Sequence, residues 1–218
     1  GKLFGEFFQR RLGSNEEKEK AMPRLRYITE SEKTPVAKEL ITSAEAKGAP
    51  DPRVVSIMTR NPKAGVAWVK YWNALLYDGV LPHSLKELCR IQISIAHQCG
   101  YCSTVRSNVA ISEGLTEEKV SQLPNFEISE EFSEREKSAL RYAALFKRGE
   151  EAIDSDEVYD DLREQFSEEE IIELGLFCAE TDGVGKFVRS LNVLSWEDAC
   201  QIDPNLEVWD QRTGTLAG

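Results

Sequence analysis

Helix start and stop signals recur along the whole chain, and they constrain its fold more than any other sequence feature. Thr34 is a candidate N-cap followed by a first-turn proline, and Gly48 is the kind of residue that ends a helix. Serine followed three residues later by glutamate, the capping-box pattern, begins segments at Ser84, Ser133 and Ser167. No pair of alternating apolar and polar runs is joined by a hairpin turn. The sequence therefore predicts an all-α protein.

Apolar residues at helical spacing between these signals give the expected helices and their grouping. The helices are expected over 36–47, 54–60, 63–77, from 84 through 95, 101–112, 116–123, from 133 to a stop at 149, and 167–191. No composition shift marks an internal boundary. We expect an N-terminal arm over 1–30, of which 1–21 could be a processed segment, a helical domain over 31–195 and a tail over 196–218. Trp209 predicts that this tail packs against another surface, such as that of a neighbouring subunit.

Charge and composition exclude several classes of function. The 218 residues carry a formal charge of -11, which opposes binding to nucleic acids or anionic membranes. No segment approaches the roughly 18 apolar residues of a membrane span, and the first residues lack the pattern of a secretory signal. A cytoplasmic location is the expectation, and in a reducing compartment five cysteines do not form a disulfide framework.

Cys99 and Cys102 are the residues most indicative of chemistry. A C-x-x-C pair at the start of a helix can approach closely enough to bond, and the free N–H groups there favour a thiolate. A thiolate is the nucleophile of sulfur chemistry. Inert packing is the alternative for this pair, and it is the preferred interpretation of Cys89, Cys178 and Cys200.

Other functions of the C-x-x-C motif fit the sequence less well. Two residues near the motif, Glu87 and His97, could also have purely structural roles. A zinc site needs four ligands, and His83 and His97 are the only histidines. A haem attachment would need histidine directly after the second cysteine, and a thioredoxin-like motif would need a βαβ context. Glu87 could simply close the capping box that begins at Ser84. His97 could be a helix C-terminal residue that interacts with the dipole.

The segment 81–120 resembles the core of the carboxymuconolactone decarboxylase and alkylhydroperoxidase AhpD-like superfamily, and the similarity extends over most of 31–195. The matching features are a proline before a helix, a glutamate, the C-x-Y-C element, an alanine and a closing glycine. They correspond to Pro82, Glu87, Cys99, Tyr101, Cys102, Ala110 and Gly114. The resemblance implies an AhpD-like helical bundle that forms a symmetric homo-oligomer, a trimer or hexamer. We expect no cofactor and no metal.

In the peroxidase branch of that superfamily, the second cysteine of the pair attacks and the first resolves. By that match Cys102 attacks a small hydroperoxide or a disulfide, and Cys99 closes the intramolecular disulfide. The branch also relays protons through a glutamate, matched here by Glu87, and through a histidine whose position is occupied by Arg106. Arginine can favour a thiolate by its charge but cannot donate and recover a proton. A relay would then use Glu87 through water, with Tyr101 or His97 as weaker substitutes.

The resulting hypothesis is a thiol oxidoreductase, either an alkylhydroperoxide reductase or a disulfide reductase. The resemblance implies that a lipoyl-bearing or thioredoxin-like dithiol resets it, often with a peroxiredoxin as partner. Two alternatives stay open. One is lactone decarboxylation, the other branch of the superfamily, which needs no cysteine pair. The other is a non-catalytic helical assembly protein, with Phe4, Phe7 and Phe8 on an arm that binds a partner.

Overall fold

The computed structural model describes residues 23–148, 151–203 and 206, and all of its regular elements there are helical. The prediction of an all-α protein is confirmed for this part of the chain. Trp209 and the three phenylalanines of the N-terminal segment lie outside it. The α-helices are α3 (Pro35–Lys47), α4 (Pro52–Met58), α5 (Ala64–Tyr77), α6 (His83–Ala96), α7 (Gly100–Thr104), α8 (Asn108–Ser112), α9 (Glu117–Ser121), α10 (Glu134–Arg148), α11 (Asp156–Gln165), α12 (Glu168–Leu191) and α13 (Trp196–Ile202). Two 3₁₀ segments, η1 (Leu123–Asn125) and η2 (Glu151–Asp154), complete the order.

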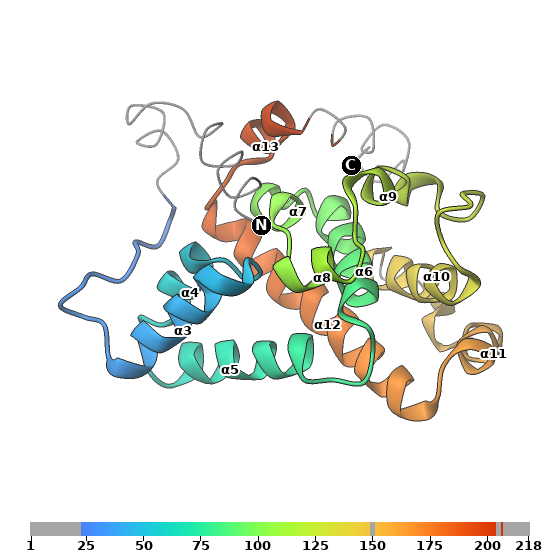
Figure 1. The fold of residues 1–218 in the computed structure, drawn as a ribbon, viewed down its shortest axis with the longest axis horizontal. Coiled ribbons are helices and arrows are strands. Elements are labelled where there is room, and N and C mark those ends of the chain that lie inside the picture. The colour runs from blue at the N-terminus through green and yellow to red at the C-terminus, as the bar shows by residue number, and fades with distance from the viewer. Residues whose placement is uncertain (1–22, 149–150, 204–205, 207–218) are drawn as a thin grey trace.

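Helix α6 is the centre of the bundle (Figure 1). It packs against α10 and α12, and also against the short helices α7 and α8 that follow it. Nearly all of its side chains are buried, including the charged Lys86, Glu87 and Arg90. Burying a charge is costly unless it is paired. Lys86 pairs with Glu173 of α12 across 2.7 Å, and Arg90 pairs with Glu87 across 2.6 Å, so the two ion pairs make this burial possible.

Several predicted helix boundaries are confirmed by their hydrogen bonds. The Thr34 side chain accepts from the Ala37 N–H, and α3 ends at Gly48 in the left-handed conformation with φ 83°. The capping box of Ser167 and Glu170 begins α12, which continues through Gly183 and Gly185 to Leu191. The backbone groups at these helix ends are therefore satisfied by residues close to them in the sequence.

Two predicted boundaries are wrong. Helix α6 begins directly after Pro82 with no side-chain cap, and the Ser84 N–H donates to Glu113 rather than joining a capping box with Glu87. The expected helix over 101–112 is broken into α7 and α8, with Val105 in an extended conformation between them. Ser107 begins the second piece, because its hydroxyl accepts from the N–H groups of Val109 and Ala110.

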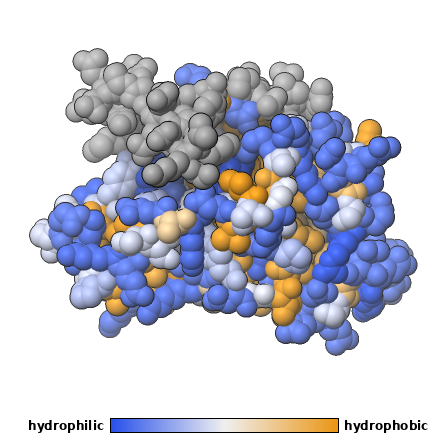
Figure 2. Space-filling model, viewed as in Figure 1, coloured by the Kyte–Doolittle hydropathy of each residue, from blue (hydrophilic) through white to orange (hydrophobic). Residues whose placement is uncertain are grey.

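The helix α13 and the residue before it lie directly against α7, which carries the cysteine pair. A Cβ built on Gly100 would lie 2.2 Å from the Ser195 carbonyl oxygen, so only glycine allows this approach. No helix of the described residues combines the length and apolarity that a membrane crossing needs. Figure 2 shows a largely hydrophilic face on which hydrophobic side chains gather where Figure 1 places the N-terminal part of α12.

We expect Gly100→Ala to destabilise the protein by about 1–3 kcal/mol, because the added methyl group must push α13 away from α7. Gly183→Ala is the matched control. A Cβ at Gly183 meets nothing within 4 Å, and alanine there should stabilise α12 by about 0.5–1 kcal/mol. Urea denaturation of the two variants measures both effects. Equal stabilities would show that the contact between α7 and the start of α13 is not as close as the structure has it.

Candidate active site

Cys99 and Cys102 lie side by side at the start of α7 and are joined as a disulfide, with their Cα atoms 5.2 Å apart. Cys99 is the N-cap residue of α7, and the Cys102 N–H donates to its sulfur across 3.2 Å. A hydrogen bond to sulfur favours its charged form. The Cys102 N–H therefore lies where it can stabilise negative charge that develops on the Cys99 sulfur.

A cavity adjoins only one of the two cysteines. Cys102 is among its lining residues and Cys99 is not, and Cys99 is 1% exposed against 8% for Cys102. The volume available to the centre of a water-sized sphere is about 60 Å³. A single water needs about 10–15 Å³ by this measure, so the cavity has room for a small organic molecule. A compound that enters it meets the Cys102 side of the disulfide.

The walls of this cavity come from the loop before α4 and from helices α4, α5, α6, α7 and α12. They are mainly apolar and include two stacked tryptophans, Trp68 and Trp72, whose ring centroids are 6.0 Å apart. The two charged side chains of the lining, Arg90 and Glu180, both have partners. The lining residues are Ala49, Pro50, Val54, Trp68, Trp72, Arg90, Ser94, Tyr101, Cys102, Val105, Glu180, Thr181, Val184, Gly185 and Val188.

Glu87 lies behind the cysteine pair and is fully buried. Its two carboxylate oxygens accept from Nε and Nη2 of Arg90, at 2.6 and 3.0 Å, and one of them also accepts from the Ser107 N–H. Burial alone would raise the pKa of Glu87, but the charge and hydrogen bonds of Arg90 outweigh it and leave that pKa below its ordinary value. The side chain is therefore a carboxylate committed to an ion pair.

Arg90 connects this ion pair to the helix that carries the cysteines. Its Nη1 donates to the Cys102 carbonyl oxygen and its Nη2 donates to the Val105 carbonyl oxygen, at 2.5 and 2.7 Å. These are carbonyls at the C-terminal end of α7, where no intrahelical donor is available. The Glu87–Arg90 pair thus fixes α7, and with it Cys102, to the central helix. Arg90 was missed by the sequence analysis, although its position three residues after Glu87 places it on the same helix face.

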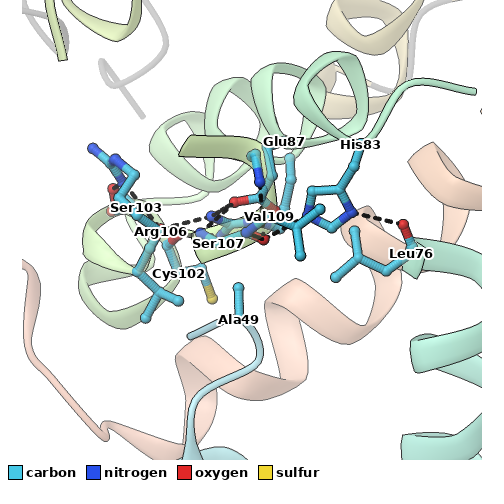
Figure 3. Close-up of polar contacts among 12 residues, drawn as sticks. Ala49, Leu76, His83, Glu87, Cys102, Ser103, Arg106, Ser107 and Val109 are labelled. Carbon is cyan, nitrogen blue, oxygen red and sulfur yellow. Dashed lines mark hydrogen bonds and ion pairs between the residues drawn. The ribbon is translucent and has the colours of Figure 1, made fainter. Parts of the chain in front are cut away.

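His83 extends the polar network at the other end of α6. Its Nδ1 lies 2.8 Å from the Leu76 carbonyl oxygen and its Nε2 lies 2.6 Å from the Ser107 hydroxyl, as Figure 3 shows. Burial lowers its pKa, so the neutral ring is favoured. His83 therefore holds Ser107, the residue that ends the break between α7 and α8.

Arg106 does not lie where the sequence predicted, next to the Cys102 sulfur. The break at Val105 means that Arg106 does not lie one helical turn beyond Cys102. It is 9% exposed; Nη1 donates to the Ser103 carbonyl oxygen at 2.6 Å and Nε donates to Glu117 at 2.9 Å. Figure 3 shows the Cys102 sulfur pointing toward Ala49, whereas the Arg106 guanidinium lies on the opposite side of α7. Arg106 thus holds the C-terminal end of α7.

Tyr101 and His97 are both committed to carboxylates. The Tyr101 hydroxyl donates to Asp51 Oδ1 at 2.9 Å, and burial with the Asp51 charge raises the pKa of Tyr101 well above 10. His97 Nε2 lies 2.7 Å from Asp182 Oδ1, its Nδ1 has no partner in the described part of the chain, and burial lowers its pKa. Tyr101 lines the cavity and fixes the loop at Asp51, while His97 joins the end of α6 to α12.

No group of three or more metal-ligating side chains is found within 23–148, 151–203 and 206. The three remaining cysteines, Cys89, Cys178 and Cys200, are buried there, as predicted. Of the described cysteines, Cys102 is the one that lines the cavity.

A family model matches part of the chain. Residues 62–145, which include α5 through most of α10, match the carboxymuconolactone decarboxylase family. The match covers less than half of the chain, so it shows a similarity to that family. No curated protein matches the chain.

Solved structures share the fold of this chain. One is the debrominase Bmp8 in its apo form, at 21% identity and a TM-score of 0.68 over 83% of this chain and 96% of that one. A cysteine-to-alanine variant of Bmp8 in complex with 2,3,4-tribromopyrrole matches at 21% identity and a TM-score of 0.62, over 88% and 96%.

A third match is a protein of unknown function from Agrobacterium tumefaciens that its name links to the antioxidant defence protein AhpD. It has 20% identity and a TM-score of 0.53, over 63% of this chain and 93% of that one. At such identities the likeness establishes the fold, which is AhpD-like.

Proposed function

We propose that the chain is a thiol-dependent reductase of small organic molecules, in which Cys102 attacks and Cys99 resolves. The observation that carries the proposal is the asymmetry of the pair: Cys102 lines the cavity, and Cys99 lies behind it against the backbone of α7. The attacking sulfur needs access to the substrate, whereas the resolving sulfur needs access only to its neighbour.

The proposed reaction with a hydroperoxide uses the two cysteines and no other reactive side chain. The Cys102 thiolate takes the terminal oxygen of a hydroperoxide, which gives a sulfenic acid and an alkoxide. The alkoxide takes the proton that Cys102 released when it ionised. Cys99 then loses its proton, and its thiolate, which the Cys102 N–H stabilises, attacks the Cys102 sulfur. Hydroxide leaves as the disulfide forms and takes up the Cys99 proton, so the products are an alcohol, water and the disulfide.

This scheme gives the other predicted site residues positioning roles. Glu87 is an inefficient acid, since both of its oxygens accept from Arg90 and its pKa is lowered. Tyr101 already donates its proton to Asp51. We therefore assign Glu87 and Arg106 to holding α7, Tyr101 to shaping the cavity, and His97 to joining α6 to α12.

A second substrate class is favoured by the apolar, tryptophan-walled cavity, which suits a flat ring. A bromoarene is reduced by the same sequence of steps. The Cys102 thiolate takes the bromine, and the ring carbanion takes the proton that Cys102 released when it ionised. Cys99 then loses its proton to solvent, and its thiolate displaces bromide as the disulfide forms. The name of the debrominase Bmp8 makes this chemistry a reasonable second test. Lactone decarboxylation is less favoured, because Arg90, the cation of the lining, is already paired with Glu87 and a carboxylate substrate would face Glu180.

Either reaction leaves a disulfide that an external dithiol must reduce. That dithiol reaches Cys102 through the cavity and expels the Cys99 thiolate, the better leaving group. A lipoyl-bearing or thioredoxin-like donor and a peroxiredoxin partner remain predictions, as does a homo-oligomer. Exposed apolar residues along α12 favour the oligomer: Ile172, Leu176 and Phe187 are 64%, 49% and 45% exposed.

The proposal is tested by measuring consumption of cumene hydroperoxide and release of bromide from a bromopyrrole, each with excess dithiothreitol. The wild type should turn over at least one of the two substrates, and the Cys99→Ser/Cys102→Ser variant should not. Cys200→Ala, which removes a buried cysteine of α13, is the control and should retain the wild-type rate. Equal rates for the wild type and the double variant with both substrates would refute the proposal.

A further inference from the structure

Two buried hydroxyl groups line the cavity beside Cys102. Ser94 of α6 and Thr181 of α12 are 2% and 5% exposed. The Ser94 and Thr181 side-chain oxygens have no hydrogen-bond partner in the described part of the chain. A hydroxyl inside a helix normally donates to the carbonyl four residues before it, as the Thr59 hydroxyl at the end of α4 does at 2.8 Å.

An unpartnered buried hydroxyl lowers the stability of the fold, so two of them on residues that line one cavity require an explanation. The rest of the lining supplies little else for polar recognition. The Glu180 carboxylate accepts from the Trp68 indole N–H at 2.5 Å, Arg90 is bonded to Glu87 and two carbonyls, and the Tyr101 hydroxyl is bonded to Asp51. Ser94 and Thr181 are therefore the uncharged polar side chains of the lining that have no partner in the described part of the chain.

We propose that Ser94 and Thr181 form a polar subsite for a small, flat, uncharged ring compound that carries a hydroxyl or N–H group. The ring occupies the apolar space lined by Trp68 and Trp72, and its polar group bonds the two hydroxyls. A ring held in this way has its edge beside Cys102. The inference rests on the proposed function only in naming the substrate of that same site.

The charge of the lining argues for an uncharged compound. An anion would meet the Glu180 carboxylate and would find the guanidinium of Arg90 already occupied by Glu87. A hydroxyl group, in contrast, can both donate and accept, so it matches either a phenol-like O–H or a pyrrole-like N–H. The subsite therefore discriminates by hydrogen bonding and by charge, while the tryptophans supply apolar contact.

Calorimetric titration of the full, oxidised protein with phenol, toluene and benzoate tests the subsite. None of these probes reacts with a thiol, so the result is independent of the proposed chemistry. We expect phenol to bind at least as tightly as the less polar toluene, and benzoate to bind at least tenfold more weakly than phenol. Ser94→Ala and Thr181→Val should each weaken phenol binding about fivefold and change toluene binding less than twofold.

Thr59→Val is the matched control, since the Thr59 hydroxyl is buried and bonded but does not line the cavity. It should leave phenol binding unchanged and lower the melting temperature by about 2–4 °C, whereas Ser94→Ala and Thr181→Val should not lower it. The inference is overturned by any of three results: no binding of phenol to the parent, unchanged phenol affinity in both site variants, or benzoate binding tighter than phenol. Should one site variant not fold, the other decides the outcome.

Discussion

Cys102→Ser is expected to abolish catalytic turnover, by at least a thousandfold, because no other sulfur of the described structure lines the cavity. Cys99→Ser is expected to behave differently. It retains the attacking sulfur, so without an external thiol it should consume about one equivalent of substrate per chain and then stop, since no resolving thiol displaces the oxidised Cys102. Stopped-flow measurement of one turnover without external thiol separates the two variants, and a steady-state assay with dithiothreitol measures the loss in Cys102→Ser. Identical residual activity in the two variants would contradict the assignment of distinct roles.

Glu87→Gln is expected to destabilise the protein by about 3–5 kcal/mol, because it leaves the Arg90 guanidinium buried without its counter-charge. This is a large share of the stability of a typical domain. Glu117→Gln provides the matched control. It also removes the carboxylate partner of an arginine, Arg106, but Glu117 is 47% exposed, and its loss should cost at most about 1 kcal/mol. Urea denaturation at pH 7 measures both changes.

The same carboxylate should make stability depend on pH in the acid range. Because the pKa of Glu87 in the folded protein lies below its ordinary value of 4.5, its ion pair contributes stability above that value. The contribution is lost as the pH falls through the lowered pKa. Glu87→Gln lacks this group, so the stability of the variant should decline less steeply in acid. A decline as steep as that of the wild type would show that Glu87 does not carry a lowered pKa.

Much of the fold follows from local sequence, and the exceptions have tertiary causes. The cap at Thr34, the stop at Gly48 and the capping box at Ser167 were predictable, because each end is satisfied by residues within a few positions of it. The pattern at Ser84 has the same form but fails, since Glu87 gains more from Arg90 in the core than from the helix start. The expected helix over 101–112 is broken at Val105, where Arg90 and Arg106 take up the carbonyls that the helix would have used.

The candidate site also has a part that the sequence predicts and a part that only the tertiary structure shows. The cysteine pair was predictable because its chemistry depends on a short spacing in the sequence. The cavity was not, since its walls come from five helices and the loop at Ala49, and no local pattern links Trp68 to Thr181. The role of Arg106 could not be predicted from the sequence either, because it depends on the break after α7 and on the ion pair with Glu117. Sequence spacing located the sulfur atoms, and tertiary structure decided which of them lines the cavity.

The most direct test of the account is to trap the oxidised sulfur. Cys99→Ser and Cys102→Ser, each reduced, would be mixed with one equivalent of cumene hydroperoxide and then with a sulfenic-acid reagent, and the labelled peptide would be identified by mass spectrometry. We predict rapid labelling at Cys102 in Cys99→Ser and only slow labelling at Cys99 in Cys102→Ser. Faster oxidation of Cys99 than of Cys102 would contradict the claim that the cavity presents Cys102 to the substrate.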